Sequence, residues 1–187
     1  MSDRIPHLVW LDDDLFEERR SYVKPWLRWF ATQINGGKIR LTLCPTLEEL
    51  ALAFQRSAAS DPGDDRIDLL VVDVMIKRSQ YPHFGALGFP SEKILRLEAG
   101  VQLVGLLRNA AHAQKREPWL HCHSDTPALL LSSSPLVAGL VSHHIDANRR
   151  DGVTVVSKTL SSALGDEAVV DDVFRRGMQT AIDLLRG

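Results

Sequence analysis

Short apolar runs alternate with longer segments of helical periodicity along this chain. The apolar runs occupy residues 6–11, 39–43, 67–72, 128–131 and 153–156. Apolar positions recur at helical spacing between and after them, which predicts helices over 16–33, 46–55, 100–113, 136–147 and 166–185. Strands that alternate with helices are typical of a parallel sheet covered by helices on both faces. The pattern therefore predicts a doubly wound α/β fold.

Two segments carry sharper local signals. The run at 67–72 is almost wholly apolar, as expected of a central parallel strand that is buried on both faces. Thr46 and Glu49 match a capping box, in which each side chain accepts from the other residue's backbone N–H, so we expect a helix to begin there.

Length and composition limit the possible classes. The 187 residues predict a single domain over 1–187, with 44% hydrophobic and 25% charged residues. A formal net charge of -2 does not favour a nucleic-acid partner, and no apolar run is long enough to cross a membrane. The start of the chain shows no signal-peptide pattern. Two cysteines are too few for a disulfide framework, and we expect a reduced, cytoplasmic setting.

Polar residues stand where the predicted strands end. Asp12 and Asp13 follow the first run, and Asp73 follows the third. Ser132 and Lys158 follow the fourth and fifth. Because ligands of an open parallel sheet bind outside the carboxyl ends of its strands, these five side chains are predicted to meet in one cleft.

These residue types suit phosphoryl transfer. Clustered carboxylates repel one another and need a cation, and oxygen ligands of this kind suit Mg²⁺. A carboxylate can attack phosphorus and form an aspartyl phosphate. An ammonium can pair with a phosphoryl oxygen, and a hydroxyl can donate to another. Positioning and charge neutralisation then supply most of the catalysis.

Four segments resemble those of a known family. Leu11-Asp12-Asp13 is similar to the acidic pair of the receiver domain of two-component response regulators, the fold of the chemotaxis response regulator. The other three segments resemble that domain's third, fourth and fifth strands with their terminal residues: 70–76 with Asp73, 127–133 with Ser132, and 155–158 with Lys158. The resemblance covers most of the chain and implies a flavodoxin-like five-stranded parallel sheet in the order 2-1-3-4-5.

The resemblance also implies roles. Asp73 would be the phosphoacceptor, and Asp12, Asp13, an Asp73 oxygen and the Met75 backbone carbonyl would hold Mg²⁺. Ser132 and Lys158 would grip the phosphoryl oxygens. The implied partners are a histidine kinase or phosphotransfer protein and an output protein contacted directly, since the last predicted helix reaches Gly187. A homodimer is left open. No enzymatic turnover is implied beyond phosphotransfer and self-dephosphorylation.

The chain departs from the family at several positions. Lys77 and Thr159 stand where receivers usually have proline, and Val155 replaces an aromatic residue that takes part in the usual readout. An insertion at about 77–96 leaves the third strand beside the phosphoacceptor. We expect it to cover the site or supply a partner surface, with a loose surface loop as the alternative. A second excursion spans 114–126.

Other interpretations remain open. A phosphatase of the haloacid-dehalogenase type would use Asp12, Asp14, Ser132, Lys158 and Asp166, but it leaves Asp73 without a role. A receiver-like module that binds partners without phosphorylation is the third possibility. Asp14 is expected to act only as a helix cap. At most two members of His121-Cys122-His123 could share a metal ion, because neighbours in an extended chain point to opposite faces.

Overall fold

The computed structural model describes residues 4–15, 30–60, 65–89, 94, 98–109, 111–112, 116–132, 136–157 and 179. Several predictions lie outside the described residues: most of the helix at 16–33, nearly all of the helix at 166–185, Lys158 and Thr159. No helix within the described ranges is long and apolar enough to cross a membrane.

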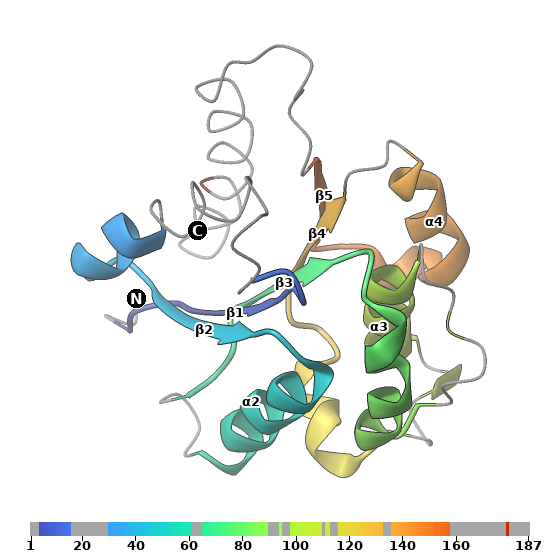
Figure 1. Cartoon of the computed structure of the whole chain (residues 1–187), viewed down its shortest axis with the longest axis horizontal. Coiled ribbons are helices and arrows are strands. Elements are labelled where there is room, and N and C mark those ends of the chain that lie inside the picture. The colour runs from blue at the N-terminus through green and yellow to red at the C-terminus, as the bar shows by residue number, and fades with distance from the viewer. Residues whose placement is uncertain are drawn as a thin grey trace.

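Five parallel strands form one sheet (Figure 1). The strands are β1 His7–Leu11, β2 Arg40–Cys44, β3 Leu69–Asp73, β4 Ala128–Ser132 and β5 Val153–Ser157. Their order across the sheet is β2-β1-β3-β4-β5. This is the flavodoxin-like order, in which the direction along which strands are added to the sheet reverses between β1 and β3. The predicted fold class is confirmed, and every predicted strand overlaps an observed one.

The described residues include the helices α2 Leu47–Ala59, α3 Ala99–Arg108 and α4 Val137–His144. A short 3-10 helix, η5, follows at Ala147–Arg149, and residues 30–35 are also helical. The predicted capping box is present, because Thr46 Oγ1 accepts from Glu49 N and the Glu49 carboxylate accepts from Thr46 N. This cap holds the first turn of α2.

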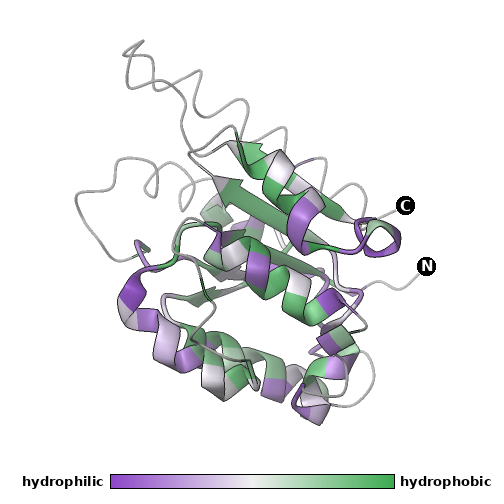
Figure 2. Ribbon diagram, turned by 90° about the vertical axis from the view of Figure 1, so that its right-hand side faces the viewer, coloured by the Kyte–Doolittle hydropathy of each residue, from purple (hydrophilic) through white to green (hydrophobic). Residues whose placement is uncertain are grey.

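Two apolar cores lie on opposite faces of the sheet. Val9, Leu11 and Val72 belong to the core that α2, α3 and α4 cover. Leu8 and Trp10, which alternate with them in β1, belong to the second core with Phe30. Because alternate residues of a strand point to opposite faces, β1, β3 and β4 are buried along their whole length. In Figure 2 these strands are almost entirely hydrophobic, whereas the helices mix hydrophobic and hydrophilic residues.

Helix α3 ends earlier than the sequence predicted, at Arg108 rather than at about residue 113. Asn109 follows it in an extended conformation. The Asn109 side-chain amide donates to His144 O at 2.9 Å, and its oxygen accepts from Asp146 N at 3.1 Å. These contacts with the end of α4 favour the turn over another residue of helix.

The two excursions form 3-10 helices packed against α2. The first, η1, spans Arg78–Leu87 and buries Phe84 and Leu87 completely. The second, η4, spans Pro118–His123 and buries Leu120 and His123. Phe84 and Leu87 therefore anchor residues 78–87 of the predicted insertion in the apolar core, while other side chains of this segment are exposed.

Candidate functional site

Four carboxylates converge at the carboxyl edge of the sheet. They belong to Asp12, Asp13, Asp14 and Asp73, here called the acidic cluster, and one oxygen from each lies within 4.8 Å of the others. In the β1–β3 register Leu11 pairs with Val72, so the next residues, Asp12 and Asp73, leave the two strands side by side. Asp12 and Asp73 are 0% and 2% exposed. The predicted convergence of the first and third strand ends is present.

Backbone N–H groups of the following turns orient two of these carboxylates. Asp14 N donates to Asp12 Oδ1 at 3.0 Å, and Met75 N donates to Asp73 Oδ1 at 3.0 Å. In each turn an aspartate accepts from the backbone two residues further on, which is a favoured local arrangement for this side chain. The backbone of its own turn thus orients each of these two carboxylates.

Lys77 supplies positive charge to the acidic cluster. Its backbone N donates to Asp13 Oδ2 at 2.7 Å, and its ammonium donates to Asp13 O at 3.0 Å. The same ammonium lies 3.0 Å from Asp14 Oδ1. Burial raises the pKa of Asp13, and the charges of Asp14 and Asp12 raise it further, although both contacts from Lys77 oppose this. Burial and the neighbouring carboxylates therefore disfavour the charged form of Asp13.

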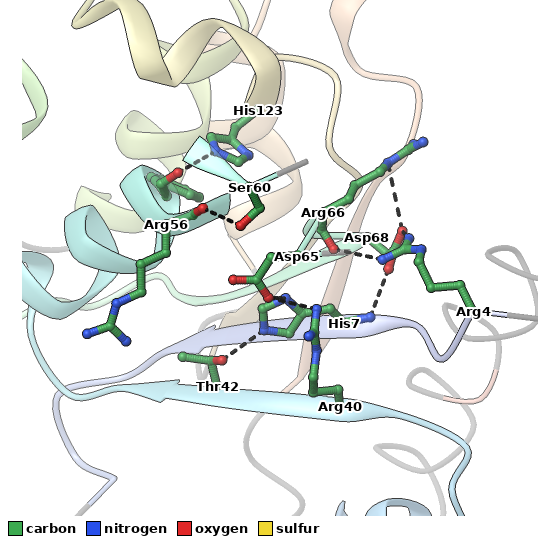
Figure 3. A network of polar contacts seen from close by, with 11 residues as sticks. Arg4, His7, Arg40, Thr42, Arg56, Ser60, Asp65, Arg66, Asp68 and His123 are labelled. Atoms are coloured by element: carbon green, nitrogen blue, oxygen red, sulfur yellow. Dashed lines mark hydrogen bonds and ion pairs between the residues drawn. The ribbon is translucent and has the colours of Figure 1, made fainter. Parts of the chain in front are cut away.

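At the amino ends of the strands, arginine side chains pair with two carboxylates (Figure 3). There Asp68 accepts from His7 N at 2.8 Å and pairs with Arg4 and Arg66. Asp65 pairs with Arg40 at 2.8 Å. Two carboxylates there meet three guanidinium groups. Within the described residues at the carboxyl ends of the strands, the ammonium of Lys77 contacts the acidic cluster.

The donor set of the acidic cluster fits a hard divalent cation. All four candidate ligands are carboxylates, and oxygen ligands of this kind suit Mg²⁺, whereas Zn²⁺ sites usually include nitrogen or sulfur. Such an ion would offset the mutual repulsion of these carboxylates. Asp14 was expected to act only as a cap, yet its carboxylate belongs to the cluster and is a further candidate ligand.

Ser132, which is predicted to bind a phosphoryl oxygen, lies next to the acidic cluster in the sheet register. Asp73 pairs with Leu131 across β3 and β4, and Ser132 is the next residue of β4. Ser132 is 2% exposed and pairs with Ser157, the last residue of β5. Lys158 follows directly but lies outside the described residues. Val155, at the position of the usual aromatic, is 36% exposed.

Sequence reasoning missed the roles of Lys77 and Gly100. Lys77 was recognised only as a departure from a proline, and its spacing from Asp13 held no signal of a contact. Gly100 was recognised only as the start of a helix. Its N donates to Val74 O at 3.0 Å, and a Cβ at this position would lie 2.0 Å from Asp73 O. Only glycine allows α3 to begin this close to the end of β3.

The segment His121-Cys122-His123 does not form a metal site in the structure. Cys122 is exposed and donates to Trp119 O at 3.3 Å. His123 is buried, stacks on Phe54 with ring centroids 4.5 Å apart, and donates through Nε2 to Phe54 O at 3.1 Å. Within the part of the chain that the structure describes, the acidic cluster is the one group of three or more potential ligands found.

Comparisons with known proteins give likenesses in fold alone. No family model and no curated protein matches the sequence. Among solved structures, chemotaxis protein CheY4 of Vibrio cholerae is 11% identical with a TM-score of 0.49, over 95% of this chain and 99% of that one. The receiver domain of Francisella response regulator 1452 is 15% identical with a TM-score of 0.41, over 94% and 98%.

The strand order identifies the class of fold. The order 2-1-3-4-5 is that of the chemotaxis response regulator and of flavodoxin. This chain therefore has the flavodoxin-like fold that receiver domains also have. Its acidic cluster lies where the strand order reverses, between β1 and β3, and such sheets bind their ligands at this point.

Proposed function

We propose that this chain is a Mg²⁺-dependent phosphoacceptor domain of two-component signalling, phosphorylated on Asp73. One observation carries the proposal: Asp73 ends the central strand β3 with its carboxylate inside a four-carboxylate cluster. A nucleophilic carboxylate, a cation-binding carboxylate set and a buried neighbouring hydroxyl are the parts that aspartyl phosphorylation needs.

The residues divide the chemistry as follows. An Asp73 oxygen attacks the phosphorus of a phosphohistidine on a kinase or phosphotransfer protein, and the P–N bond breaks with its electron pair leaving on the imidazole. Asp12, Asp13 and Asp73, with the Met75 carbonyl, would hold Mg²⁺, which neutralises phosphoryl charge. The hydrogen bond from Met75 N to Asp73 Oδ1 orients the nucleophilic carboxylate. Ser132 and Lys158 are proposed to bind phosphoryl oxygens.

The readout is proposed to be protein–protein contact. Met75 at 39%, Leu136 at 75% and Val155 at 36% are among the few large apolar side chains exposed in the described residues. Met75 lies two residues beyond Asp73, the last residue of β3, and Val155 stands where the family usually has its readout aromatic. An output protein could bind through such side chains without an aromatic switch.

The test is intact mass after incubation with acetyl phosphate and MgCl₂. The wild type should gain one phosphoryl group that is acid-stable and base-labile, and should lose the gain in EDTA. Asp73→Asn should gain none. Asp125→Asn removes an exposed carboxylate that precedes β4 at the other edge of the sheet, and should behave as the wild type. Equal labelling of Asp73→Asn would refute the proposal.

The same preparations separate the two alternatives. Sustained hydrolysis of phosphate esters that is lost in Asp12→Asn and retained in Asp73→Asn would favour the phosphatase. A wild type that takes no phosphoryl group and shows no Mg²⁺-dependent response to beryllium fluoride would favour a binding module that works without phosphorylation.

A further inference from the structure

The backbone of Lys77 is held beside the acidic cluster from two sides. On one side the Lys77 backbone N donates to Asp13 Oδ2 at 2.7 Å. On the other side Lys77 is the N-cap residue of η1, so the start of that helix follows it directly. Its side chain is only 38% exposed, and the ammonium contacts Asp13 O and Asp14 Oδ1, each at 3.0 Å.

Helix η1 is itself anchored on α2. Leu47 N donates to Gln80 Oε1 at 3.2 Å, which satisfies one of the N–H groups left open at the start of α2. His83 pairs with Glu48 at 2.8 Å, and Phe84 is fully buried. The position of Lys77 therefore depends on packing that is independent of any ligand at the acidic cluster.

A divalent cation bound at the acidic cluster would lie close to the ammonium of Lys77. One oxygen from each of the four carboxylates lies within 4.8 Å of the others, and the Lys77 ammonium lies 3.0 Å from an oxygen of one of these carboxylates, Asp14. A divalent ion bound among these oxygens would stand within a few ångströms of a like charge, in a partly buried setting where such repulsion is weakly screened. The lysine stem can relieve the repulsion by turning its ammonium toward solvent, at the loss of its two contacts.

We infer that Lys77 is a built-in counter-ion of the acidic cluster, which stabilises the metal-free protein and competes with the divalent cation. The inference rests on the proposed function, because it assigns a residue of this chain to that metal site. Lys77 would thereby set the Mg²⁺ concentration at which the site fills.

The test compares Lys77→Met with the wild type by calorimetric titration with MgCl₂. Methionine keeps a similar stem, and the backbone N–H to Asp13 does not depend on the side chain. The variant should bind Mg²⁺ about tenfold more tightly, since the like charge is removed. Lys77→Arg keeps the charge and should stay close to the wild type. Lys38→Met removes an exposed lysine before β2, at the other edge of the sheet, and should change nothing.

Unfolding midpoints supply a second readout that does not require catalysis. In EDTA, Lys77→Met should unfold at a lower urea concentration than the wild type, and saturating MgCl₂ should raise its midpoint by more. If Lys77→Met is unfolded in EDTA, Lys77→Gln takes its place in both measurements. Unchanged or weaker Mg²⁺ affinity in the uncharged variants would overturn the inference.

The two proposals fail in different ways. If the uncharged variants bind Mg²⁺ more tightly while wild-type Asp73 takes no phosphoryl group, the counter-ion role stands and the phosphoacceptor function is refuted. If Asp73 is phosphorylated and the affinities are equal, only the counter-ion role is refuted. If neither the wild type nor Lys77→Met binds Mg²⁺, the counter-ion inference and the metal dependence of the proposed function both fail.

Discussion

Gly100 N donates to Val74 O at 3.0 Å, immediately after the proposed phosphoacceptor Asp73. The backbones approach so closely that a Cβ on Gly100 would stand 2.0 Å from Asp73 O and 2.9 Å from Val74 Cα. The start of α3 thus sets the position of the end of β3. Gly100, which follows the insertion, therefore helps to position the side chain of Asp73, which precedes it.

Gly100→Ala is expected to destabilise the protein by about 3 kcal/mol, because either the helix or the strand end must move. It should also slow acetyl-phosphate labelling of Asp73, since the carboxylate shifts with its backbone. Gly139→Ala is the matched control, because Gly139 lies in α4 with nothing within 4 Å of an added Cβ. Urea unfolding should show that control to be neutral or up to about 1 kcal/mol more stable. Equal effects of the two substitutions would contradict the close approach.

Asp13→Asn should weaken Mg²⁺ binding at least about tenfold, because one charged ligand is lost from the acidic cluster. In EDTA the same variant should unfold at a higher urea concentration than the wild type, because burial and the neighbouring carboxylates raise the pKa of Asp13 and so disfavour its charge. Calorimetric titration and urea unfolding measure the two effects. A variant that is less stable both with and without Mg²⁺ would argue against a crowded anionic site.

Arg108→Met should cost about 2–4 kcal/mol of stability. Arg108 is 5% exposed, and its guanidinium donates to the carbonyl oxygens of Thr126, Arg149 and Asp151 at 2.6–2.8 Å. These carbonyls precede β4 and β5, so the substitution would leave buried acceptors unsatisfied where the two strands begin. Arg56→Met, at an exposed position of α2, should stay within about 0.5 kcal/mol of the wild type in urea unfolding.

His123 should make the protein less stable as the pH falls. Burial lowers its pKa below the ordinary value of 6.5, although the hydrogen bond to Phe54 O acts in the opposite direction. In the unfolded chain this imidazole is protonated as the pH falls through about 6.5, whereas in the folded protein it is protonated only at lower pH. The free energy of unfolding therefore decreases as the pH falls through that range.

Urea unfolding at pH 7.5 and pH 5.5 measures this loss. It should be smaller in His123→Gln than in the wild type. His143→Gln, at an exposed position of α4, should keep the wild-type pH dependence. An unchanged pH dependence in His123→Gln would show that this imidazole does not carry the effect.

The sequence predicted most of the sheet, because its signals there are local or repeat along the chain. Apolar runs identified all five strands, and Thr46 with Glu49 located the start of α2. The meeting of Asp12, Asp13 and Asp73 also followed from sequence, since neighbouring parallel strands end at one edge and the aspartates directly follow two of them. The place of Ser132 beside Asp73 followed in the same way.

Tertiary structure alone decided the features that depend on non-local contact. Nothing in the spacing of Lys77 and Asp14 indicates an ion pair, because it arises from how η1 packs on α2. Two further contacts also join segments that are far apart in the sequence. His123 packs on Phe54, and Gly100 closely approaches Asp73. Local patterns specify which segments become strands and helices, whereas the loops between them settle which side chains meet. The counter-ion of the acidic cluster comes from such a loop.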